Sequence, residues 1–279
     1  MIHNLIKLYK ENQVIEDPHY CKDLPLHKAC PSSELCWQGR EKDDKELDKY
    51  NGIHLPFIGP YYCNSPFRLA ALGQNYHGYG GLLSAHHLFI DLINRLQKGY
   101  KTMHKGSTLF HRLAVYATLM IRSDWRIEGE DVFMGESRLV DSFEALADSL
   151  NHIVFLNAIK CSPHWERSEP THPMFDNCPK KFLVKELEIL SPKILLVLGK
   201  RTLDTIPKQN CKTVEKAEDS QSEIHQTELT NGPVVVFKVV HPAARNGGNA
   251  ESIILNAAKL LRTPNVMEIL QIGRRNTCF

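Results

Sequence analysis

Four short runs of the chain are rich in Val, Ile and Leu on both faces, and they limit the choice of fold more than any other feature. They cover residues 68–72, 152–157, 193–198 and 234–240. A strand with one face in water alternates apolar and polar side chains, whereas a strand of a parallel sheet is covered on both faces and reads as a continuous apolar run. The sequence therefore predicts a buried sheet that is mostly parallel.

Helical patterns separate these runs. Apolar residues recur at helical spacing over residues 82–96 and 109–121, which contain no Gly or Pro, and further helices are expected over 142–150 and 180–190. A Ser-Pro pair directly after the last of these favours the end of a helix. The alternation of strands and helices predicts a three-layer α/β/α sandwich around a short central sheet.

Length and composition fit a single domain. The chain has 279 residues, of which 42% are hydrophobic and 24% charged, which is enough for one sizeable core. We expect residues 1–279 to form that domain, with residues 1–60 as an N-terminal arm. The stretch 207–232 is polar and lacks periodicity up to the strand that follows, so we interpret it as a variable surface loop.

The sequence patterns also bear on location and partners. No apolar run approaches the roughly 20 residues of a membrane-spanning helix, so we expect no membrane association. The first residues carry lysines within an amphipathic pattern and have no secretory core, which predicts a cytoplasmic, nucleoid-associated protein. The net charge of 34 − 32 = +2 neither supports nor excludes nucleic acid, because such binding then depends on local charge.

Polar motifs follow three of the strands at the point where each strand ends. GQNYH (residues 73–77) follows the first strand, FLN ends the second strand at Asn157, and HPAARN (residues 241–246) follows the fourth strand. Ligands of open parallel sheets bind beyond the carboxyl ends of the strands. We therefore expect the three motifs to form one site.

Cysteine is the second chemical signal. Eight cysteines in a chain that we expect to be intracellular favour metal ligands, reactive thiols or buried residues over disulfides. Cys161 and Cys178 form a C-x16-C pair, and Cys30 and Cys36 form a C-x5-C pair with Cys21 nearby. Four thiolates suit an iron-sulfur cluster or a zinc ion.

The order and spacing of these motifs resemble the uracil-DNA glycosylase superfamily, and most closely its iron-sulfur (family 4 type) branch. The resemblance covers most of residues 30–261 and is closest over 157–200. It implies a monomeric DNA-repair enzyme of that fold that flips a deaminated base, uracil, out of DNA. The enzyme would then hydrolyse the N-glycosidic bond and leave an abasic site.

The resemblance assigns two catalytic residues. Asn75 would position the attacking water, which suffices for an oxocarbenium-like transition state that needs an oriented water more than a strong base. Tyr76 stands where the family usually has Pro. His241 would donate a hydrogen bond to the base oxygen that gains charge as the bond breaks.

Further residues are expected to bind the substrate. Gly73 and Gln74 form the turn after the first strand, and Asn157 would read the Watson-Crick edge of uracil through its carboxamide. Arg245 and Asn246 belong to the loop that would press into the minor groove.

An aromatic side chain should stack on the flipped base. Phe110 is our candidate for this role, with Tyr79 or His77 as replacements.

The resemblance also implies a 4Fe-4S cluster held by Cys30, Cys36, Cys161 and Cys178. The first pair in the family is normally C-x2-C, so Cys21 remains an alternative to the upstream ligands, and zinc remains an alternative to iron. The cluster would be structural, because base excision needs no redox step.

Three other functions stay open at the level of sequence. One is a glycosylase for a different damaged base such as hypoxanthine. Another is a catalytically silent iron-sulfur protein of the same fold that only binds nucleic acid. The third is a hydrolase of free nucleosides.

Overall fold

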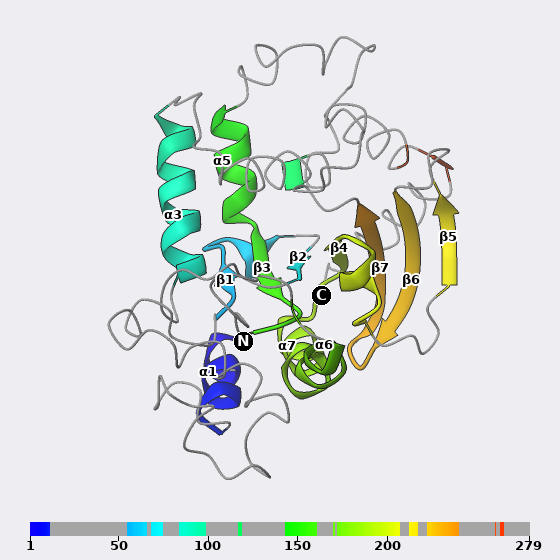
Figure 1. The fold of residues 1–279 in the computed structure, drawn as a ribbon. Helices are drawn as coiled ribbons and strands as arrows, with labels where there is room; N and C mark the ends of the chain where they lie inside the picture. Colours follow the sequence, from blue (N-terminus) through cyan, green and yellow to red (C-terminus); the bar gives the residue numbers. More distant parts are fainter. Residues whose placement is uncertain are drawn as a thin grey trace.

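A seven-stranded sheet forms the centre of the protein in the computed structural model (Figure 1). The residues described by the structure are 1–11, 55–65, 68–74, 84–98, 117–118, 143–160, 170, 172–206, 212–216, 222–239, 260 and 263–264. Within them the strand order is β1-β3-β2-β4-β7-β6-β5. The strands are β1 (Phe57–Ile58), β2 (Leu69–Gly73), β3 (Ile153–Asn157), β4 (Ile194–Leu198), β5 (Lys212–Lys216), β6 (Glu223–Leu229) and β7 (Gly232–Val239).

The four strands predicted from the sequence form the middle of this sheet. β3, β2, β4 and β7 are neighbours in that order and all pair in parallel. β1 adds to one side and β6 and β5 add to the other, each antiparallel to its neighbour. The predicted parallel centre is therefore confirmed, and antiparallel strands border it on both sides.

Helices cover both faces of the sheet. One face carries α3 (Ser84–Gln97) and α5 (Phe143–Asn151). The other carries α1 (Ile2–Glu11), α6 (His172–Cys178), a π-helical turn (Pro179–Leu183), α7 (Val184–Leu190) and α8 (Lys200–Leu203).

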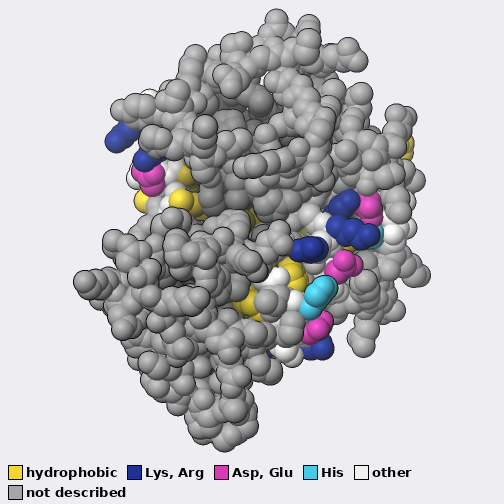
Figure 2. Space-filling model, viewed as in Figure 1, with side chains coloured by type: hydrophobic (Ala, Val, Ile, Leu, Met, Phe, Trp, Pro, Cys, Tyr) yellow, Lys and Arg dark blue, Asp and Glu magenta, His cyan; other side chains and the backbone are white. Residues whose placement is uncertain are grey.

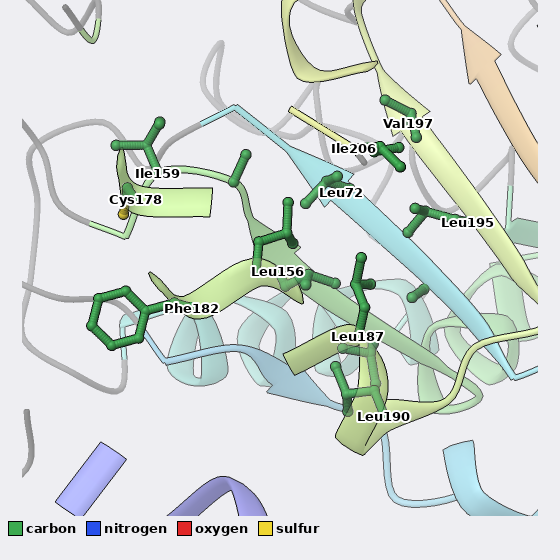
Figure 3. Close-up of a cluster of buried hydrophobic side chains, with 14 of the residues drawn as sticks. Leu72, Leu156, Ile159, Cys178, Phe182, Leu187, Leu190, Leu195, Val197 and Ile206 are labelled. Atoms are coloured by element: carbon green, nitrogen blue, oxygen red, sulfur yellow. The ribbon is translucent and has the colours of Figure 1, made fainter. Parts of the chain in front are cut away.

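Two consecutive residues of β3 demonstrate the three layers. The ring of Phe155 contacts Phe89 of α3, whereas Leu156 belongs to the core cluster that contains Leu187 of α7 (Figure 3). Successive side chains of a strand point to opposite faces, so α3 and α7 lie on opposite sides of the sheet. The predicted α/β/α sandwich is confirmed.

The predicted helices agree with the structure wherever it describes them. In α3, Phe89, Leu92, Ile93 and Leu96 are buried at the spacing of one helical face. α7 ends at Leu190, as the Ser-Pro signal indicated, and the next residue, Ser191, adopts the left-handed conformation and donates its N–H to the carbonyl of Leu187. Of the predicted helix 109–121, only residues 117–118 are described, and both are helical.

The range 207–232 contains more regular structure than its composition suggested. The sequence interpretation as a loop missed strands β5 and β6, which extend the sheet beyond β7. These strands contain many polar side chains, so a search for apolar runs does not detect them. On β6 and β7, Glu223 accepts hydrogen bonds from His225 (Nε2 to Oε2, 3.0 Å) and Lys238 (Nζ to Oε1, 3.3 Å), and all three side chains are largely buried.

None of the helices in the described ranges is both long and apolar enough to span a bilayer.

The Glu223 cluster should contribute to stability. Replacing Glu223 by Ala leaves the buried His225 and Lys238 without this acceptor, so we expect the free energy of unfolding to fall by about 1–3 kcal/mol. Denaturant titration measures the change. The control is Glu228→Ala, an exposed residue of the same strand, which should shift the unfolding midpoint little. Equal effects of the two substitutions would contradict the role of the cluster.

Candidate active site

The carboxyl ends of β2 and β3 meet at one point of the sheet edge. Their register pairs Gly73 with Asn157. The pairing continues past both strands, because Ala158 donates its N–H to the carbonyl of Gly73 (2.9 Å) and Ile159 donates to that of Gln74 (2.9 Å). Three of the predicted site residues, Gly73, Gln74 and Asn157, are thus held together by backbone pairing.

Asn157 presents a buried acceptor at this edge. The residue is 4% exposed, and its Oδ1 atom has no hydrogen-bond partner among the residues that the structure describes. An amide oxygen kept from water without a donor is unfavourable by a few kcal/mol, roughly 1–3 in proteins. A ligand that brings a donor to this atom would remove that cost, so Asn157 is suited to reading a polar edge.

Gly73 is needed for space rather than for backbone conformation. A Cβ atom at this position would lie 2.6 Å from Oδ1 of Asn157 and 3.1 Å from Cζ of Phe155. Both distances are shorter than ordinary van der Waals contacts, and the first would force the carboxamide to move. The glycine therefore lets Asn157 lie directly against β2.

Aromatic rings support this corner of the site. Phe155, two residues before Asn157 on the same face of β3, lies 5.2 Å from the ring of Phe89 between centroids. Phe89 in turn stacks on Phe57 of β1 at 4.5 Å and an interplanar angle of 8°. All three rings are buried, so packing fixes the position of Phe155 beside Gly73 and Asn157.

The other face of the sheet carries the predicted metal ligand Cys178. It is 3% exposed, ends α6 immediately before the π-helical turn, and lies beside Ile159 at one end of the core cluster (Figure 3). Its Sγ accepts a hydrogen bond from the backbone N–H of Lys160 at 3.3 Å. Hydrogen bonds to sulfur orient and tune the thiolate ligands of metal groups, so the position of Cys178 is compatible with the implied group.

The rest of the implied ligand set is not described by the structure. Cys30, Cys36, Cys161 and the alternative Cys21 lie outside the described residues. Within the described ranges no group of three or more His, Cys, Asp or Glu side chains is placed to hold a metal ion. The ligand set therefore stays a prediction.

A buried charged network lies next to Cys178. Lys160 and Glu186 form an ion pair whose side chains are 1% and 0% exposed, facing each other without ideal hydrogen-bond geometry. The hydroxyl of Tyr9 in α1 donates to the other carboxylate oxygen of Glu186. Burial, and then the charge of Glu186, raise the pKa of Tyr9 far above its ordinary value, so this hydroxyl stays protonated and acts as a neutral donor.

Several predicted residues fall outside the described residues. These are Asn75 and His241, the aromatic candidates Phe110, Tyr79 and His77, and the loop residues Arg245 and Asn246. Their roles stay predictions from the resemblance.

The sequence reasoning missed a basic pair at the same edge. Lys200 and Arg201 follow β4 and are exposed. Gly199 precedes them with φ 95°, a conformation that favours glycine, and donates its N–H to the carbonyl of Val239 (2.8 Å). The rule that located the other motifs, namely polar residues directly after a buried strand, would have found this pair.

Among the described residues on the face in Figure 2, positive and negative side chains are mixed. In Figure 2, Lys and Arg side chains gather over the part of the sheet where Figure 1 shows β6 and β7, with acidic side chains beside them. The net charge of the whole chain is only +2, so it supplies little long-range attraction for a polyanion.

Comparison with known families agrees with this geometry. The model of the uracil DNA glycosylase superfamily matches residues 94–262, more than half of the chain. A search of curated proteins found no match. The matched range contains Asn157, Cys178, the parallel strands β3, β4 and β7 and the HPAARN motif. This membership supports a glycosylase-type hydrolase activity on DNA. The chain belongs to the uracil-DNA glycosylase superfamily.

Proposed function

We propose that this protein excises uracil from DNA by hydrolysing the N-glycosidic bond and leaving an abasic site. The superfamily supports the reaction class. The observation that carries the choice of base is Oδ1 of Asn157 at the carboxyl end of β3, which is buried and has no hydrogen-bond partner among the described residues. Such an atom needs a donor, and a flipped uracil brings one.

The carboxamide of Asn157 can both accept a hydrogen bond from the edge of uracil and donate one to it. Its Oδ1 accepts a hydrogen bond from N3–H of uracil, and its Nδ2 donates to the neighbouring O4. Cytosine has an acceptor at N3 and an amino donor at C4, so both contacts would be reversed. Leaving these buried groups mismatched costs about 1–3 kcal/mol, which disfavours the normal base.

Bond cleavage would use two residues assigned by the resemblance. As the bond between C1′ and the base nitrogen breaks, negative charge develops on the base and His241 donates a hydrogen bond to its oxygen. Asn75 orients the water that attacks C1′. The products are an abasic sugar and free uracil.

A metal group is proposed as a structural element. Cys30, Cys36, Cys161 and Cys178 would hold a 4Fe-4S cluster, and the buried thiol of Cys178 with its backbone donor supports one of the four positions. The group would tie the N-terminal arm to the segment after β3 and take no part in hydrolysis.

The first experiment tests Asn157 and the substrate together. A labelled oligonucleotide with a single uracil is incubated with anaerobically purified protein, and abasic sites are detected by alkaline cleavage. We expect cleavage by the wild type, loss of cleavage in His241→Ala, and a reduction of about 10- to 100-fold in Asn157→Ala. Asn94→Ala, an exposed residue of α3, is the matched control and should cleave normally.

Other results would point elsewhere. Cleavage of hypoxanthine but not uracil would replace the proposed substrate. Release of uracil from free deoxyuridine without a DNA strand would indicate a nucleoside hydrolase. Binding of DNA with no cleavage of any lesion would indicate a silent member of the superfamily.

Gly73 should act on the reaction through Asn157. In Gly73→Ala the new Cβ displaces Oδ1, so we expect uracil cleavage to fall by about tenfold or more. In the Asn157→Ala background there is no Oδ1 to displace, so adding Gly73→Ala should reduce uracil cleavage little further. Uracil kcat/KM for the wild type, both single variants and the double variant measures this coupling. Fully additive losses would show that Gly73 acts independently of Asn157.

Lys200 and Arg201 are proposed to contact the DNA backbone. Binding to a phosphate releases counterions, so removing one contact should lower the slope of log binding constant against log salt by about 1. Fluorescence anisotropy of labelled DNA over a salt series measures the slope for Lys200→Ala and Arg201→Ala. Lys185→Ala on α7 is the exposed control. An unchanged slope in both variants would place the DNA elsewhere.

A further inference from the structure

Three segments that are distant in the sequence meet at one buried carboxylate. Tyr9 comes from α1, Glu186 from α7, and Lys160 from the segment that follows β3. The side chains of Lys160 and Glu186 are almost completely buried, and Tyr9 is 2% exposed. A buried ion pair is weak evidence for stability, because desolvation offsets the attraction between the charges. Stability alone therefore does not explain why these three polar side chains are buried together.

Lys160 contacts one continuous helical segment at two points. Its side chain pairs with Glu186 in α7, and its backbone N–H donates to Sγ of Cys178 at the end of α6. α6, the π-helical turn and α7 follow one another without interruption over residues 172–190. Two contacts to the same segment fix both the position and the direction of the Lys160 backbone, and thereby aim its N–H at the sulfur.

The same carboxylate contacts α1 through Tyr9 and the segment that follows β3 through Lys160. Lys160 immediately precedes Cys161 in the sequence. Tyr9 lies in α1, which precedes the part of the chain that contains Cys30 and Cys36. α1 packs against α7, and the Tyr9 hydroxyl adds a directional contact to Glu186. One side chain, Glu186, thus joins the start of the N-terminal arm to the segment around the C-x16-C pair.

We propose that Tyr9, Glu186 and Lys160 form a positioning network that holds Cys178 and its backbone donor in place for the metal group. The inference rests on the metal site of the proposed function. Hydrogen bonds to metal-bound sulfur orient the ligand, and partners of this kind typically change metal affinity by about 10- to 100-fold when they are removed. Loss of the network should therefore speed metal release more than it lowers the stability of the fold.

The decisive variant removes all three polar groups at once. Tyr9→Phe, Lys160→Met and Glu186→Leu together leave side chains of similar size and no unpaired charge, so the core should stay packed. Holoprotein purified without oxygen is mixed with a chelator, and metal release is followed by the visible absorption of the cluster and by iron and zinc analysis. We expect about tenfold faster release, with an unchanged midpoint of thermal unfolding before the chelator is added.

Two controls separate positioning from general destabilisation. Leu96→Ala creates a cavity in α3, on the opposite face of the sheet, and should lower the unfolding midpoint while leaving metal release unchanged. Tyr9→Phe alone removes a single hydroxyl and should speed release severalfold, which keeps the test available if the triple variant does not fold. Release at the wild-type rate in Tyr9→Phe and in any folded triple variant would overturn the network.

A separate variant tests the premise. Cys178→Ala should lose bound metal if the proposed site exists. Wild-type protein that contains no iron or zinc, or a Cys178→Ala variant that keeps its full metal content, would overturn the metal site and the positioning role with it. Cys178→Ala could lose its metal while the network variants release metal at the wild-type rate. That combination would overturn the positioning role and leave the metal site standing.

Discussion

The parallel pairing of β2 with β3 is the constraint on which the site depends. Its register places Gly73 opposite Asn157, and two further backbone hydrogen bonds carry the pairing beyond the ends of both strands. A slip of one residue would turn Asn157 to the opposite face and leave a different residue against Gly73. The apolar side chains on both faces prevent such a slip, because each strand is buried between two layers of helices.

The central sheet and its helices were predictable because burial determines their sequence. Strands covered on both faces are apolar throughout, and the helices between them carry one apolar face, so local patterns located β2, β3, β4, β7, α3, α5 and α7. The position of Asn157 followed from the same pattern, since a polar residue directly after a buried strand lies at the carboxyl edge of the sheet. These features depend on short stretches of sequence.

Features that depend on contacts between distant segments could not be read from the sequence. β5 and β6 are polar strands, and on β6 the partly buried Glu223 accepts hydrogen bonds from the buried His225 and from Lys238 of β7. The need for glycine at position 73 becomes visible only when Asn157 lies against it. The network of Tyr9, Lys160 and Glu186 joins residues as far as 177 positions apart. In each case the feature depends on which residues are close in space, and their separation in the sequence does not reveal this.

Four consecutive residues connect the two sides of the sheet. Asn157 faces the layer of α3 and α5, and Lys160, three positions later, pairs with α7 and donates to Cys178. Between them, Ala158 and Ile159 hold the backbone to Gly73 and Gln74 through hydrogen bonds. A metal group at Cys178 would therefore stiffen the segment that sets the direction of the Asn157 carboxamide, although no metal atom need approach the base. A metal group at Cys178 would in this way influence base recognition through the few backbone residues between Lys160 and Asn157. It would take no part in the hydrolysis.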